Sequence, residues 1–142
     1  MLKNIPGILS PELLKILMEM GHGDELVIAD GNFPGASHAQ KLIRLDGHGV
    51  PVVLAAILKF FPLDSYVENP AGVMAVTPGE NYKPVIWNEY REIILQSKEH
   101  FKEFEFIEKF VFYERARKAY AVIATSESAL YANIILKKGV VV

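Results

Sequence analysis

The sequence contains no cysteine, which excludes several kinds of chemistry at once. Without cysteine there is no disulfide framework, no thiolate nucleophile and no thiolate metal site. An excess of charge of one sign is also missing, because 15 basic residues stand against 17 acidic ones in 142 residues. Proteins that bind nucleic acid or anionic membranes usually carry a clear basic excess. We therefore expect no nucleic-acid and no membrane partner, but a small molecule or another protein.

Long hydrophobic runs are absent as well. No apolar run approaches the roughly 20 residues of a membrane-spanning helix, and the first residues, 1–6, have no signal-peptide core. These absences favour a cytoplasmic protein. The hydrophobic share of 51% and the mean hydropathy of +0.19 are nevertheless high for this length. We expect neighbouring subunits to cover part of the apolar surface, so that the protein is a homo-oligomer.

Several motifs that carry chemistry do not occur. The sequence has no Gly-x-Gly-x-x-Gly and no Gly-x-x-x-x-Gly-Lys-Ser/Thr, so no cradle for nucleotide phosphates is predicted. The Gly-x-Ser-x-Gly elbow of acyl-transfer enzymes is missing too. His22 and His48 each lie between glycines, but no His-x-His or His-Glu-x-x-His accompanies them. We therefore predict no metal site.

Apolar patterns of helical and strand type alternate along the chain. Ser10 is a suitable N-cap, Pro11 suits the first helical turn, and Gly21 is expected to end this helix in the left-handed conformation. Further helices are predicted over 52–61, 84–101 and 109–119, and strands over 26–29, 41–45, 73–77, 120–125 and 134–136. The alternation predicts one α/β domain over residues 1–142, with three layers, α/β/α, around a mostly parallel sheet. Short connections leave room for an antiparallel strand in a mixed sheet.

One short apolar strand has ionisable side chains at both ends. His22 lies in the bend before it and Asp30 follows its last residue. Loop positions beside rigid elements often carry binding and catalytic groups. A structural alternative stays open, in which His22 caps the preceding helix and Asp30 opens an Asx-type turn. Tyr113, Tyr131 and Asn133 are further polar groups among apolar neighbours, and such groups need hydrogen-bond partners when buried.

Several short motifs, taken in order along the chain, resemble those of a known family. They are His22-Gly23-Asp24-Glu25, Asp30, Phe112-Tyr113-Glu114-Arg115-Ala116, the pair Tyr131 and Asn133, and Lys137-Lys138-Gly139. In this combination the chain resembles the ribose pyranase and fucose mutarotase family over nearly its whole length, and the Phe-Tyr-Glu-Arg-Ala run is similar to the fucose branch. The resemblance implies an isomerase that interconverts the anomers of free L-fucose without a cofactor. It also implies a ring-like homo-oligomer, often a decamer.

The resemblance further implies roles for individual residues, and His22 matches the proton donor. Substrate-binding positions of the family correspond to Asp30, Lys109, Tyr131 and Asn133, and supporting positions to Asp24, Tyr113 and Glu114. Lys109 stands where the fucose branch commonly has arginine, so the charge is kept and the planar fork is lost. Ala132 stands where glycine is common, which matters if that backbone needs a positive φ.

Mutarotation needs only an acid and a base. The ring opens when the ring oxygen gains a proton and the anomeric hydroxyl loses one, and it closes again on the other face of the aldehyde. Imidazole exchanges protons near neutral pH, so His22 is the expected acid, while Asp30 holds hydroxyls and is a candidate base. An extended strand rises about 3.3 Å per residue, which separates the two by well over about 10 Å. Either the glycine loop folds back or, as we favour, a neighbouring subunit completes the pocket.

Two alternatives remain at this point. The chain could act on another monosaccharide in the manner of the ribose pyranases. It could also be a non-catalytic sugar-binding module that keeps Asp30, Tyr131 and Asn133 and does not use His22 for proton transfer. Exchange between the anomeric protons of fucose distinguishes a mutarotase from a binding module.

Overall fold

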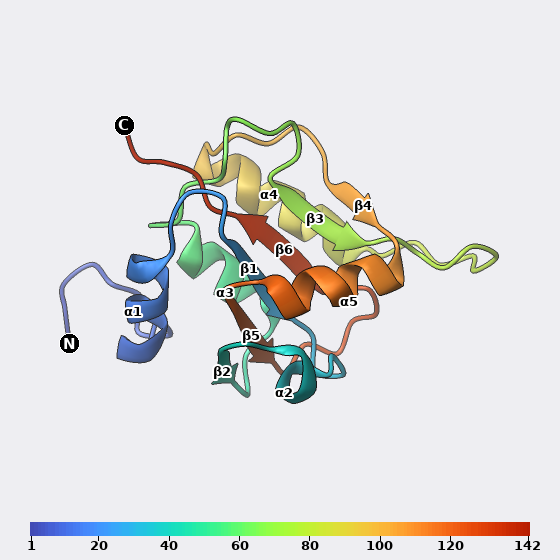
Figure 1. Cartoon of the computed structure of the whole chain (residues 1–142), viewed down its shortest axis with the longest axis horizontal. Helices are drawn as coiled ribbons and strands as arrows, with labels where there is room; N and C mark the ends of the chain where they lie inside the picture. Colours follow the sequence, from blue (N-terminus) through green and yellow to red (C-terminus); the bar gives the residue numbers. More distant parts are fainter.

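The computed structural model describes residues 1–142 and consists of a six-stranded sheet between two layers of helices (Figure 1). The strands are β1 (Glu25–Ala29), β2 (Leu42–Leu45), β3 (Ala71–Met74), β4 (Glu105–Ile107), β5 (Ala121–Thr125) and β6 (Ile134–Lys137). The helices are α1 (Pro11–Glu19), α2 (Gly35–His38), α3 (Val50–Ile57), α4 (Ile86–Ser97) and α5 (Lys109–Lys118). None of these helices combines the length and the apolar character needed to span a bilayer.

The strand order in the sheet is β2-β5-β1-β6-β3-β4. Strand β6 pairs antiparallel with both β1 and β3, whereas the pairs β1–β5, β2–β5 and β3–β4 are parallel. The predicted mostly parallel, mixed sheet is therefore confirmed. Because β6 runs against the other strands, its amino end lies at the same edge of the sheet as their carboxyl ends. Ligand sites of open α/β sheets usually form at that edge.

Helices cover both faces of the sheet, with α2 and α5 in front and α3 and α4 behind in Figure 1. Along β1, Leu26 and Ile28 pack into the larger hydrophobic cluster, which contains the apolar faces of α1, α3 and α4. Val27 and Ala29 point the other way, into a smaller cluster with α5. Both faces of β1 are buried, which explains its uninterrupted apolar run. The three-layer α/β/α arrangement is thus confirmed.

The end of α1 differs from the prediction. Ser10 caps its start as expected, by accepting a hydrogen bond from a first-turn N–H. Met20 then leaves the helix with extended backbone, and the left-handed conformation falls on Gly23 (φ +87°) and not on Gly21. The reason is a tight turn, in which the Asp24 N–H donates to the Gly21 carbonyl and the Asp24 carboxylate accepts from the Gly21 N–H (2.7 Å).

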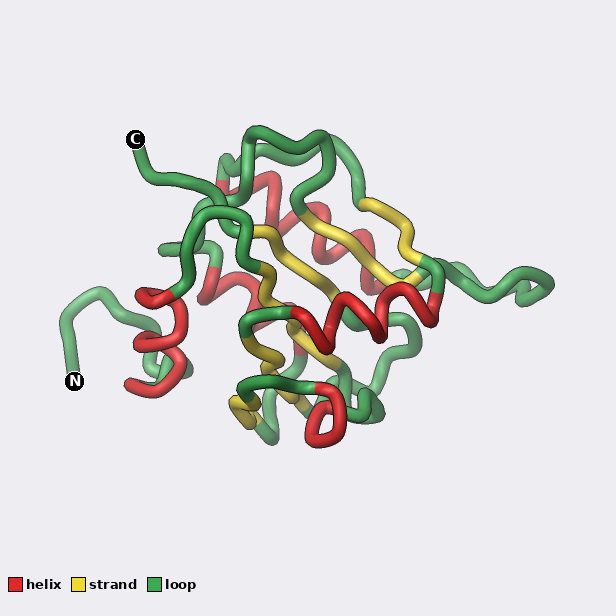
Figure 2. Tube along the Cα trace, viewed as in Figure 1, coloured by secondary structure: helices red, strands yellow, loops and turns green.

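The prediction missed two elements, α2 and β4, because four and three residues are too short to show a periodic pattern. Three boundaries were also wrong. Strand β3 lies earlier than the predicted range 73–77, helix α3 covers Val50–Ile57 and not 52–61, and α4 ends at Ser97, after which Lys98 turns left-handed (φ 63°). Residues 75–85 consequently form a loop that projects from the body, the green segment at the right of Figure 2.

Candidate functional site

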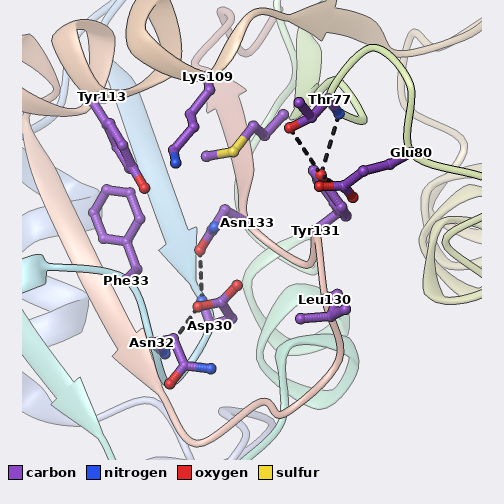
Figure 3. A pocket seen from close by; sticks show the side chains of 11 residues that line it. Asp30, Asn32, Phe33, Thr77, Glu80, Lys109, Tyr113, Leu130, Tyr131 and Asn133 are labelled. Atoms are coloured by element: carbon purple, nitrogen blue, oxygen red, sulfur yellow. Dashed lines mark hydrogen bonds between the residues drawn. The ribbon is translucent and has the colours of Figure 1, made fainter. Parts of the chain in front are cut away.

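A pocket of about 290 Å³ opens at the edge of the sheet where β1 and β3 end and β6 begins (Figure 3). Its lining comprises Asp30, Asn32, Phe33, Met74, Thr77, Glu80, Lys109, Tyr113, Leu130, Tyr131 and Asn133. Small-molecule sites usually measure about 300–1,000 Å³, so this pocket suits a single small ring. The lining mixes polar and apolar side chains.

Asp30 and Asn133 form the buried floor of the pocket, with 9% and 5% of their surfaces exposed. The Asp30 N–H donates to the Asn133 Oδ1 (2.7 Å), and the Asn32 N–H donates to the Asp30 Oδ1 (3.0 Å), which is the predicted Asx-type turn. Burial raises the pKa of the Asp30 carboxyl above its ordinary value, although the N–H groups of Asn32 and Phe33 and the Asn133 side chain oppose the shift. Asp30 is thus a fixed acceptor with a raised affinity for protons.

Tyr131 contributes one wall and has an unusual backbone, with a φ of 57°. Two side chains of α4 hold this backbone: the Trp87 Nε1–H donates to the Tyr131 carbonyl (2.8 Å) and the Tyr90 hydroxyl donates to the Ala132 carbonyl (2.8 Å). Burial raises the pKa of Tyr90 far above its ordinary value, so its hydroxyl remains a donor. The positive φ falls on Tyr131 and not on Ala132, and alanine at position 132 is therefore unstrained.

The Tyr131 hydroxyl meets the projecting loop. It lies 2.7 Å from the Glu80 Oε2 and 3.1 Å from the Thr77 Oγ1, and it accepts a hydrogen bond from the Thr77 N–H (3.2 Å). Figure 3 shows these three residues together at one side of the pocket. Two side chains of the loop and one from the segment before β6 thereby form one hydrogen-bonded unit.

Aromatic groups and one cation form the opposite wall. Phe33 and Tyr113 pack with ring centroids 5.7 Å apart, and the Lys109 Nζ lies 6.0 Å from the Tyr113 ring centroid. Figure 3 shows the Lys109 ammonium and the Tyr113 hydroxyl directed toward the same space. Lys109 is exposed and forms no ion pair. This wall can contact the C–H face of a sugar and still offer a charged donor to a hydroxyl.

His22 does not line this pocket. It precedes β1, whereas Asp30 follows it, and the two therefore lie at opposite edges of the sheet. The His22 Nε2 lies 3.0 Å from the Asp64 Oδ1, and its ring packs 5.4 Å from the ring of Tyr66. The expectation that His22 caps α1 is wrong, because its hydrogen bond runs to Asp64, 42 residues away.

The carboxylate of Asp64 makes this histidine unusual. The Asp64 side chain is 4% exposed, whereas that of His22 is 45% exposed. Burial by itself raises the pKa of the Asp64 carboxyl, but the N–H of Tyr66, the imidazole of His22 and the charge of Lys137 outweigh it, so the pKa lies below its ordinary value. The Asp64 carboxylate fixes one ring nitrogen of His22 by this hydrogen bond, while nearly half of the His22 side chain remains exposed.

The structure therefore divides the predicted residues into two groups. The pocket brings together Asp30, Lys109, Tyr113, Tyr131 and Asn133. His22, Asp24 and Glu114 lie elsewhere: Asp24 shapes the turn beside His22, and Glu114 is exposed and pairs with Arg117 (3.5 Å).

Sequence reasoning missed Asp64 and Glu80. Each contacts its partner across a long stretch of chain, 42 residues from Asp64 to His22 and 51 from Glu80 to Tyr131. Neither residue belongs to a motif with recognisable spacing. The Pro78-Gly79 turn was the only local sign that Glu80 occupies a defined position.

The pattern of the RbsD / FucU transport protein family matches residues 3–141. The chain belongs to this family. A fucose mutarotase of Homo sapiens is 52% identical over 145 residues, which is 98% of this chain and 94% of that protein. The crystal structure of the fucose mutarotase of Streptococcus pneumoniae in complex with L-fucose matches with a TM-score of 0.94 and 54% identity, over 99% of this chain and 100% of that one.

A ribose-binding member of the family is less similar. The structure of Bacillus subtilis RbsD complexed with D-ribose matches with a TM-score of 0.73 and 26% identity, over 96% of this chain and 98% of that one. Both solved structures share the fold of this chain, and the fucose mutarotase is the more similar to it of the two, in sequence and in structure. The resemblance to the fucose branch is therefore confirmed.

Proposed function

We propose that this chain is a cofactor-independent mutarotase, an isomerase that interconverts the α and β anomers of free L-fucose. The observation that carries the proposal is the near coincidence of its fold with a fucose mutarotase that was crystallised with L-fucose, at a TM-score of 0.94 and 54% identity. The pocket agrees with this substrate, because it has the size of one sugar ring and combines buried acceptors with an aromatic wall.

The pocket residues hold the sugar in this proposal. The Asp30 carboxylate accepts hydrogen bonds from its hydroxyls, the Asn133 amide donates to them, and Lys109 offers a charged donor from the opposite wall. Tyr113 and Phe33 contact the apolar face of the ring. Lysine supplies a single flexible charge, which suits one hydroxyl better than a pair of hydroxyls.

The acid is His22, supplied by a neighbouring subunit. Strand β1 alone spans five residues, or roughly 16 Å at the usual rise, and separates His22 from the pocket of its own chain. His22 is outward-facing and backed by Asp64, as a proton donor to another molecule requires. The protein acts as a closed homo-oligomer, with a decameric ring as the expected form, in the cytoplasm.

Exposed aromatic surface beside the pocket supports this assembly. Phe106 and Phe110 are 48% and 69% exposed. They line a second pocket, and Thr77 and Lys109 line both this pocket and the one that contains Asp30 and Asn133. Large apolar side chains exposed together usually mark an interaction surface. A neighbour that covers them would lie at the mouth of the pocket.

The base must receive the proton of the anomeric hydroxyl. Two groups of the pocket can accept this proton. One is the Asp30 carboxylate, whose pKa is raised, and the other is the Tyr131 hydroxyl, which is hydrogen-bonded to the Glu80 carboxylate. A positioned acid or base contributes roughly 10²–10⁴ in rate. Mutarotation has no redox or group-transfer step, and such groups are sufficient for it.

Saturation-transfer NMR tests the proposal. Catalytic amounts of the protein should accelerate the exchange between the α and β anomeric protons of L-fucose. Line broadening without faster exchange would indicate a non-catalytic sugar-binding module. Parallel measurements with ribose, galactose and glucose test the substrate, and a faster rate with ribose would favour the ribose-pyranase alternative.

A further inference from the structure

The Tyr131 hydroxyl has more hydrogen-bond partners than its single proton can serve. Its oxygen lies 2.7 Å from the Glu80 Oε2, 3.1 Å from the Thr77 Oγ1 and 3.2 Å from the Thr77 N–H. An ionised carboxylate can only accept, so Tyr131 donates its proton to Glu80. The Thr77 N–H then donates to Tyr131. The second lone pair of the phenol oxygen accepts the Thr77 hydroxyl proton, or a proton from a sugar hydroxyl when the Thr77 hydroxyl turns its proton away.

A local turn holds Glu80 and Thr77 in this arrangement. The Glu80 N–H donates to the Thr77 carbonyl (3.1 Å), and Gly79 between them has a φ of +93°. Proline followed by a glycine with positive φ is the pattern of a type II turn, which fixes the ends of four residues relative to each other. The two groups that contact the Tyr131 oxygen therefore come from one preformed unit.

Tyr131 is also fixed in position, through both its backbone and its ring. Trp87 bonds its carbonyl (2.8 Å), and Tyr82 of the same projecting loop stacks on its ring, with centroids 6.0 Å apart and planes inclined by 28°. Glu80 itself forms no ion pair with any basic side chain. A carboxylate without a cation has one evident partner here, the phenol that lines the pocket.

Resting on the mutarotase function proposed above, we infer that Glu80 is a positioning residue that makes Tyr131 the base of the reaction. As the bond between C1 and the ring oxygen breaks, the proton of the anomeric hydroxyl moves to the Tyr131 oxygen, and the proton of Tyr131 moves to Glu80. The ring oxygen takes its proton from the acid, His22. Glu80 ends protonated and His22 ends neutral, and closure of the ring on the other face of the aldehyde returns both protons.

The test uses the full-length protein and the anomer-exchange assay with L-fucose. Glu80→Gln keeps the shape of the side chain and removes its charge, and Tyr131→Phe removes the hydroxyl. Lys83→Gln is the matched control, because it removes a charge from the same loop at an exposed residue without a hydrogen bond to the site. Rates at several fucose concentrations separate kcat from KM.

We expect Glu80→Gln to lower kcat roughly 10–100-fold with little change in KM, since a charge-assisted hydrogen bond at the reacting group is lost. Lys83→Gln should retain the wild-type rate. The double variant Glu80→Gln/Tyr131→Phe should be no slower than Tyr131→Phe alone, because Glu80 acts only through the Tyr131 hydroxyl.

Two results would overturn the inference. One is wild-type kcat in Glu80→Gln. The other is a further loss of rate when Glu80→Gln is added to Tyr131→Phe, since a residue that merely shapes the loop would lower activity with or without the hydroxyl. A wild-type protein that does not accelerate exchange at all would instead refute the proposed mutarotase function. The failure of one proposal is thereby distinguishable from the failure of the other.

Discussion

Two inactive variants should restore each other if the site is shared between subunits. His22→Ala removes the acid, and Asn133→Ala removes a pocket residue at the opposite edge of the sheet. In a closed oligomer each site would take its histidine from one chain and its asparagine from the next. Subunits mixed after unfolding should therefore form some sites in which both side chains are present.

The expected recovery follows from counting. In an equal mixture, half of the chains carry an intact His22 and the other half an intact Asn133, so about one quarter of the sites at random assembly have both. If both side chains served a site within one chain, no site would be intact. The Asn133→Ala subunit leaves the buried Asp30 N–H without its partner, which costs roughly 1–3 kcal/mol. Thermal unfolding must show that this variant is folded before mixing.

Anomer exchange measured by NMR gives the activity, and native mass spectrometry of tagged subunits verifies the hybrids. Each variant alone, taken through the same unfolding and mixing, gives the background. A mixture of His22→Ala with Asp64→Asn is the matched negative control, because both residues belong to the same chain and neither subunit supplies an intact pair. Verified hybrids of His22→Ala and Asn133→Ala without recovery would refute a site shared between subunits.

Three further outcomes are expected. Burial raises the pKa of Asp30 above its value in the unfolded chain. The stability of the fold therefore falls as the pH rises from the unfolded pKa to the folded pKa of this carboxyl. Asp30→Asn should lose activity yet melt at a higher temperature than the wild type at pH 7, and the difference in melting temperature should shrink in acid. Equal melting temperatures at both pH values would contradict this. Tyr90→Phe leaves the buried Ala132 carbonyl without its donor and should lower the free energy of unfolding in urea by about 1–3 kcal/mol. Exhaustive chelation should leave the exchange rate unchanged, and a loss that a divalent ion reverses would overturn the proposed mechanism.

Sequence patterns predicted the elements that are long or regular. Strand β1 was recognisable because four buried residues follow one another, and α1 because its cap and its apolar spacing agree. The order of helices and strands was sufficient for the fold class, since alternating elements favour helices on both faces of a sheet. Elements of three or four residues have no period to detect, and α2 and β4 were missed for that reason.

The sequence by itself also determined which residue types could carry the chemistry: without cysteine or a metal motif, it left an imidazole, carboxylates and phenols. Only the tertiary structure decided which of them meet. The reversed direction of β6 brings Tyr131 and Asn133 to the same edge of the sheet as Asp30. The length of β1 keeps His22 at the opposite edge of the sheet. Contacts such as Glu80 with Tyr131 join segments far apart in the chain. Strand pairing in the sheet fixes those distances, and no local pattern in the sequence encodes them.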